Sequence, residues 1–112
     1  MGYDESLAQT MRAALGQGGG ISEKRMMGAI CFFLNGNMVG GVDRPKGGTD
    51  RFMFRVGKNN EAAQNLPGGA PMIHGGRTMS GFYFVAAGDC DAPLLRRWLD
   101  AALDHARRLP PK

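Results

Sequence analysis

Hydrophobic residues recur at three- and four-residue spacing near both ends of the chain, a pattern that predicts amphipathic helices. The first stripe, within residues 4–15, is made of Leu7, Ala8, Met11, Ala14 and Leu15. The second, near the C-terminus, is made of Leu95, Trp98, Leu99, Ala102, Leu103 and Ala106. Asp4 and Ser6 are both candidate caps for the first helix, and Asp91 is the candidate for the last. Each helix is expected to bury its stripe against a shared core.

Between the helices the pattern changes to apolar runs and strict alternation, which predict strands. Residues 22–34 and 37–42 form two strands joined by Asn35-Gly36, a strong hairpin signal. Within the second of them, Gly40-Gly41 predicts a bulge or a close contact with another backbone. Residues 51–56 alternate, so that Phe52, Phe54 and Val56 share one face and Arg51, Met53 and Arg55 share the other.

A short helix is expected after Asn59 or Asn60, ending at Pro67, and two further strands over residues 72–74 and 78–86. The predicted order is helix, three strands, helix, two strands, helix (α-β-β-β-α-β-β-α). This order predicts an α+β fold in two layers, with an antiparallel sheet and the helices on one face. Residues 1–112 are expected to form a single domain.

Composition narrows the class of protein. The chain is 43% hydrophobic and 21% charged, which is typical of a globular protein, and it has no apolar run of the ~18 residues that a membrane span needs. Two cysteines are too few for a disulfide scaffold. No secretory signal peptide is recognisable, so the cytoplasm is the expected location and no membrane partner is expected.

The net charge of +4 is concentrated in the middle of the chain. From Lys24 to Arg77, eight Lys and Arg residues stand against three Asp and Glu residues. Such a basic region can bind phosphates or an acidic protein, or can simply be a solvated face.

Reactive side chains are few and scattered, so no catalytic, metal or cofactor residues are assigned and no enzyme activity is expected. His74 and His105 have no second ligand at metal-site spacing. Cys31 lies in an apolar strand and is expected to be buried. Cys90 lies between two aspartates, which should raise the pKa of its thiol. The glycine runs match no phosphate-binding motif.

The best candidate for an interaction surface is the polar face of residues 51–55. It consists of Arg51, Met53 and Arg55, with Lys24, Arg25 and Arg77 joining it if their strands are neighbours. Arginine beside apolar area suits contact with acidic protein or phosphate. The competing interpretation is that Arg55 binds an aspartate or a helix-end carbonyl and only stabilises the fold. The aromatic residues Phe52, Phe54, Phe82 and Phe84 are expected to be buried, which argues against stacking on bases.

An ordered set of short motifs resembles the TfoX/Sxy N-terminal domain family across nearly the whole chain. The motifs are Glu23-Lys24-Arg25-Met26-Met27-Gly28, Cys31-Phe32, Asn35-Gly36-Asn37-Met38, Arg55-Val56-Gly57, Gly69-Ala70-Pro71-Met72 and the segment from Gly76 to Val85. The resemblance implies a fold similar to secretion chaperones and a relation to bacterial regulators of natural competence. Full-length members carry a second, C-terminal domain, and this chain ends before one, so the resemblance implies a stand-alone N-terminal domain. Met27, where the family commonly has Phe, and a longer, more basic loop at 43–50 depart from the pattern.

These observations lead to three functional hypotheses. The first is a non-enzymatic regulatory module, of the transcription-regulation kind, that binds a protein partner, with a second copy of the chain as one candidate. The second is direct binding of DNA or RNA through the basic middle region. The third is an enzyme or small-ligand site.

Overall fold

The computed structural model describes residues 3–16, 18–26 and 28–112, except for the side chain of His74. Three helices are described, α1 (Glu5–Leu15), the short α2 (Glu61–Gln64) and α3 (Ala92–Arg107). The strands are β1 (Ile21–Met26), β2 (Ala29–Leu34), β3 (Asn37–Asp43), β4 (Arg51–Arg55), β5 (Gly69–His74) and β6 (Arg77–Ala86). A 3-10 turn, Ala87–Asp89, leads into α3.

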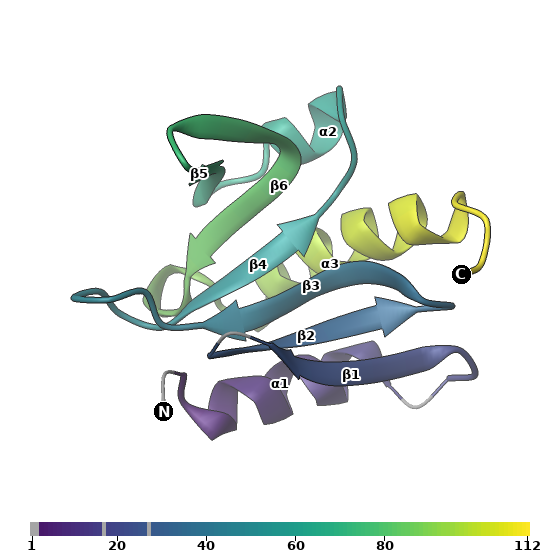
Figure 1. Ribbon diagram of the computed structural model, residues 1–112, viewed down its shortest axis with the longest axis horizontal. Helices are drawn as coiled ribbons and strands as arrows, with labels where there is room; N and C mark the ends of the chain where they lie inside the picture. Colours follow the sequence, from purple (N-terminus) through teal and green to yellow (C-terminus); the bar gives the residue numbers. More distant parts are fainter. Residues whose placement is uncertain (1–2, 17, 27) are drawn as a thin grey trace.

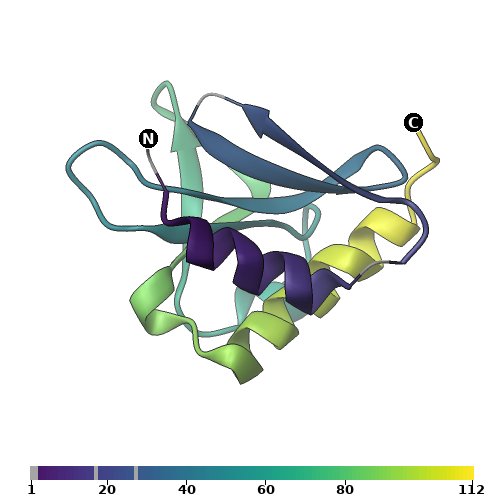
Figure 2. The same cartoon turned by 90° about the horizontal axis from the view of Figure 1, so that it is seen from below.

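The six strands form one antiparallel sheet in the order β1-β2-β3-β4-β6-β5 (Figure 1). Helices α1 and α3 lie side by side on one face of this sheet, and Figure 2 shows both on the same side. Among the described elements, no helix covers the opposite face, which we call the open face. The predicted α+β class, the antiparallel sheet and the order of helices and strand groups are confirmed.

The sheet has one strand more than predicted, because residues 22–34 form two strands rather than one. Strands β1 and β2 pair from Ile21 with Leu34 to Met26 with Ala29. Gly28, in the connection, has a φ of 80°, a conformation that glycine adopts at little cost. Met27, one of the two departures from the family pattern, lies outside the described residues.

Both long helices begin at the predicted aspartates. The Asp4 carboxylate accepts a hydrogen bond from the Ser6 backbone N–H at 2.9 Å, and Asp91 accepts one from the Leu94 N–H at 3.0 Å. Asp4, rather than Ser6, is therefore the cap of α1. Such caps satisfy N–H groups that have no partner within the helix.

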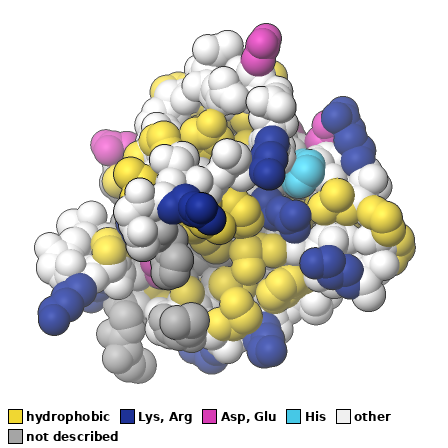
Figure 3. Space-filling view, turned by 45° about the horizontal axis from the view of Figure 1, so that its top comes forward, with side chains coloured by type: hydrophobic (Ala, Val, Ile, Leu, Met, Phe, Trp, Pro, Cys, Tyr) yellow, Lys and Arg dark blue, Asp and Glu magenta, His cyan; other side chains and the backbone are white. Residues whose placement is uncertain are grey.

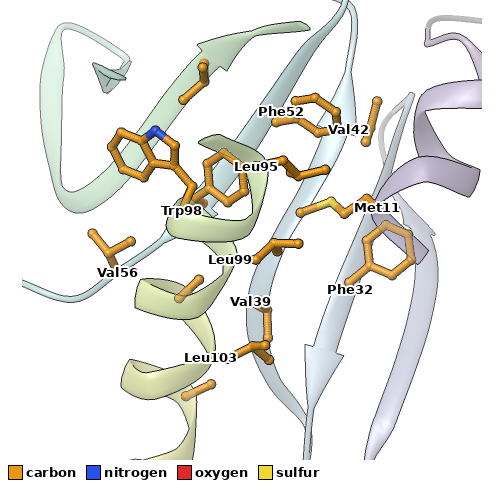
Figure 4. Packing of buried hydrophobic residues seen from close by; sticks show 14 of the residues in the cluster. Met11, Phe32, Val39, Val42, Phe52, Val56, Leu95, Trp98, Leu99 and Leu103 are labelled. Carbon is orange, nitrogen blue, oxygen red and sulfur yellow. The ribbon is translucent and has the colours of Figure 1, made fainter. Parts of the chain in front are cut away.

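The core lies between the two long helices and the sheet. Figure 4 shows Trp98, Leu99 and Leu103 of α3 directed toward the strands, with Met11 of α1 beside them. Trp98 is completely buried, its ring stacks on Phe54 with 5.4 Å between centroids, and its indole N–H donates to the Pro67 carbonyl at 3.2 Å. The stripes predicted for both helices thus face the sheet.

The C-terminal tail is held against the β2–β3 turn. Asn37 is the one polar residue described as buried, with 1% of its surface exposed. Its amide donates to the Pro110 carbonyl at 2.9 Å, and the Lys112 N–H donates to the Asn35 carbonyl at 2.8 Å. These bonds tie residues 110–112 to the far end of the sheet.

Replacing Asn37 by alanine is expected to lower the free energy of unfolding by about 1–2 kcal/mol, because a buried hydrogen bond and its packing are lost. Urea denaturation measures the change. Asn65→Ala, at an exposed position, is the control and should change stability by less than about 0.5 kcal/mol. Equal stabilities for the two variants would contradict the role given to Asn37.

Candidate interaction surface

The pairing of β3, β4 and β6 places the predicted polar face of residues 51–55 on the open face. Met53 pairs with Gly41 on one side and Phe84 on the other, and Arg55 pairs with Phe82. Directly paired residues project to the same side of a sheet. The buried Phe52 and Phe54 project to the helix side.

The centre of the open face is apolar. Its half-buried side chains are Phe33, Met38, Met53, Phe82 and Phe84. Figure 3 shows hydrophobic side chains gathered in the middle of this view, with Lys and Arg side chains around them. A hydrophobic centre with a charged rim is typical of protein interaction surfaces.

The prediction that all four phenylalanines are buried is wrong for two of them. Phe52 and Phe54 are buried, but Phe82 and Phe84 lie half-exposed on the open face. Tyr83 of β6 contacts the Trp98 ring at 5.6 Å and therefore faces the helices, so its neighbours must face away. Burial therefore argues against base stacking for Phe52 and Phe54 only, and not for Phe82 and Phe84.

Arg51 is fixed in place by two neighbours. Its guanidinium donates to both oxygens of the Asp43 carboxylate, at 2.8 and 3.2 Å, and lies 3.4 Å from the centroid of the Phe84 ring. A two-point pair and a cation–π contact hold the side chain rigidly. The structural role suggested for Arg55 is thus filled by Arg51.

Arg55 has more freedom. Its guanidinium lies 5.8 Å from the Phe82 centroid, and the ion pairs formed by the described residues do not include it. Lys24, on the edge strand β1, is exposed and occupies the same row across the sheet as Met53, with Cys31 and Gly41 between them. Both cations therefore belong to the rim of the open face.

Arg25 and Arg77 do not join this cluster. Arg25 pairs with the core residue Ile30, so it lies on the helix side, where it donates to the Tyr3 hydroxyl and lies 3.5 Å from the Glu5 carboxylate. Adjacent residues of a strand point to opposite faces, which separates Arg25 from Lys24. Arg77 lies at the end of the β5–β6 hairpin, paired with His74 and away from the row of Met53.

Both cysteine thiols have a pKa above the ordinary value for cysteine. Cys31 is 3% exposed, as predicted, and burial, with a smaller effect of Asp43, raises the pKa of its thiol. Burial first and Asp91 second raise the pKa of Cys90 to about 11. The direction predicted for Cys90 is confirmed, although burial contributes more than the neighbouring charge. Among the described residues, no three His, Cys, Asp or Glu side chains converge as a metal site would require.

Sequence reasoning misses several members of the surface. It assigns Phe82 and Phe84 to the core and Asp43 to a polar loop, although Asp43 neutralises Arg51. Lys58 and His105 also lie near Arg55, around a groove at the edge of the open face. The run Phe82-Tyr83-Phe84-Val85 is apolar throughout, so the only signal is that successive side chains of a strand point to opposite faces.

The fold and this face define a two-layer α+β domain in which one face of the sheet is covered by no described helix. The sequence model of the TfoX N-terminal domain matches residues 13–106. The chain therefore belongs to the TfoX N-terminal domain family and is a competence-regulator-like domain. The TfoX N-terminal domain family is not a known enzyme family. No curated protein and no solved structure matches the chain, so its similarity to secretion chaperones stays a prediction.

Within the described residues, the helices are too short or too polar to span a lipid bilayer.

Proposed function

We propose that the chain is a non-enzymatic regulatory domain that binds an acidic protein through its open face. The observation that carries the proposal is the apolar centre of this face beside the cations Lys24, Arg51 and Arg55. Met53 lies between the two arginines and is half-buried, so a partner can cover apolar area while its carboxylates meet the cations. Arginine and methionine are enriched at protein interfaces for these reasons.

Charge favours an acidic partner over a second copy of the chain. Asp43 neutralises Arg51, but Lys24 and Arg55, on the same face, take part in none of the ion pairs formed by the described residues. Two copies joined symmetrically through their open faces would bring these cations together, and like charges in an interface weaken binding. Sedimentation at two protein concentrations tests for such a dimer. If the wild-type chain dimerises and Met53→Glu abolishes the dimer, the occupant of the open face is a second copy and not an acidic partner.

A carboxylate at the centre of the open face is expected to reduce partner capture about tenfold or more, since it would oppose the partner's own carboxylates. The variant is Met53→Glu, and Met53→Gln is its neutral control of similar shape. Both side chains would be partly exposed, so folding should be preserved and is checked by circular dichroism. Capture of proteins from bacterial extract is measured for each variant. The protein captured by the wild-type chain is identified, and its net charge is determined.

The pattern of losses decides the outcome. Loss with Glu, retention with Gln and retention with Arg97→Glu, an exposed position on α3, support the proposal. Undiminished capture by Met53→Glu would refute it. Arg51 is a less suitable position, because its removal leaves the Asp43 carboxylate without its partner and lowers stability as well.

Nucleic acid is the second candidate, favoured by the half-exposed rings of Phe82 and Phe84 beside the two arginines. Bases can stack on such rings, and phosphates can meet the cations. Titration with single-stranded DNA and RNA at two salt concentrations tests this. Affinity that falls steeply with salt and is lost in Phe84→Ala would favour nucleic acid over an acidic protein.

A further inference from the structure

A groove at one edge of the open face collects basic side chains from three segments. Arg55 ends β4, Lys58 follows in the connection to α2, and His105 lies in the last turn of α3. Phe82 and Leu109 supply an apolar part of the same lining. These segments are distant in sequence, so only the folded chain assembles the groove.

His105 is held in the groove by close packing on Gly57. A Cβ atom at Gly57 would lie 2.7 Å from Cε1 of the imidazole and 3.1 Å from its Cγ, and the φ of Gly57 is +89°. The absence of a side chain therefore lets the ring lie against the backbone. Burial, and then the positive charges of Arg55 and Arg108, lower the pKa of His105, while Asp104 acts in the opposite direction.

The charges around the groove do not balance. Arg108 pairs with Asp104 at 2.8 Å, but Arg55 and Lys58 take part in none of the ion pairs of the described residues. Glu61 of α2 lines the adjoining hollow with Asp104 rather than the groove itself. Arg55 and Lys58 thus lie in the same groove as the imidazole of His105, whose pKa is lowered by burial first and then by the charges of Arg55 and Arg108.

We propose that this groove binds the phosphoryl group of a small phosphate monoester between Arg55, Lys58 and His105, with the organic part of the ligand against Phe82 and Leu109. A phosphate monoester carries about −1.5 to −2 charges near neutral pH, which matches the two uncompensated cations. The dianion would also reverse the field at His105, so that the imidazole takes up a proton and becomes a third donor. The site does not depend on the protein partner proposed above.

Ligand binding should be visible in the titration of His105. The chain has two histidines, and His74→Gln leaves His105 as the single histidine signal in proton NMR. We expect the pKa of His105 to lie below 6.5 in chloride, and to rise by about one unit at saturating inorganic phosphate if binding is tenfold tighter to the protonated ring. Phenyl phosphate should give the same rise at a lower concentration, because its ring can contact Phe82. Acetate at equal ionic strength tests whether any carboxylate suffices.

Two arginine variants separate this site from a general charge effect. Arg55→Gln should raise the pKa of His105 in the free protein and remove most of its response to phosphate. Arg107→Gln, at an exposed position outside the groove lining, should leave the response unchanged. An unresponsive His105, an equal response to acetate, or an equal response in both arginine variants would overturn the proposal. Each result is obtained on the isolated chain, so failure here leaves the test of partner capture intact.

Discussion

Trp98→Ala is expected to lower the free energy of unfolding by about 3–5 kcal/mol, the largest of the expected losses of stability. The indole is fully buried, stacks on Phe54 and donates to the Pro67 carbonyl. A Cβ atom built at Gly69 would lie only 2.7 Å from Cη2 and Cζ2 of the Trp98 ring. The indole therefore packs directly against the backbone of β5. Alanine would leave a cavity that the rigid sheet cannot close. Chemical denaturation followed by circular dichroism measures the loss.

Trp98→Phe is the control for this change. It keeps an aromatic ring against Phe54 but removes the N–H donor to Pro67, so its loss should be clearly smaller than that of alanine. Because a domain of this size is stable by about 5–15 kcal/mol, the alanine variant would be partly unfolded at moderate temperature. A loss below about 1 kcal/mol for Trp98→Ala would contradict this description of the core.

The second large effect is expected at Gly40, where alanine should lower stability by about 1–3 kcal/mol. A methyl group there would overlap the backbone carbonyl of Met53 and approach the methyl of Met11 to 3.1 Å. Since a backbone atom in a paired strand cannot move aside alone, strands β3 and β4 would have to separate or the α1 contact would have to open.

Gly18→Ala provides a matched control for Gly40→Ala. No atom lies within 4 Å of a Cβ built at Gly18, and its backbone does not require positive φ. This variant should therefore be as stable as the wild type or slightly more stable, because alanine restricts the unfolded chain. Equal thermal midpoints for Gly40→Ala and Gly18→Ala would show that the close approach at Gly40 is not a real constraint.

The sequence predicted a bulge or a close contact with another backbone at Gly40-Gly41, but it did not predict which strands make that contact. The register between β2 and β3 shifts next to Phe32, where Gly40 is the partner, and the carbonyls of Met53 and Ile30 lie against the two glycines. Two successive glycines in an otherwise apolar strand indicate that a neighbouring backbone leaves no space for a side chain there. Which neighbouring strand takes that space depends on pairing across the sheet, and local pattern carries no information on it.

For the candidate surface, too, the sequence predicted some positions and strand pairing decided the others. Alternation placed Arg51, Met53 and Arg55 on one face, because side chains of successive strand residues point to opposite sides. The positions of Lys24 and Arg25 could not be decided in this way, since both are polar neighbours on an edge strand. Pairing of Lys24 with Cys31, and of Arg25 with Ile30, assigned one to the open face and the other to the helix side.

By itself, the sequence determined local features of this protein: two amphipathic helices, the aspartate cap of the second helix, a hairpin at Asn35-Gly36, and an alternating strand at 51–56. Each depends on residues a few positions apart, whose spacing fixes which side chains share a face. The tertiary structure alone decided the pairing of Arg51 with Asp43 and the meeting of Arg55 with His105. These depend on strand register and helix packing, which arise from contacts between distant segments that bury the common core.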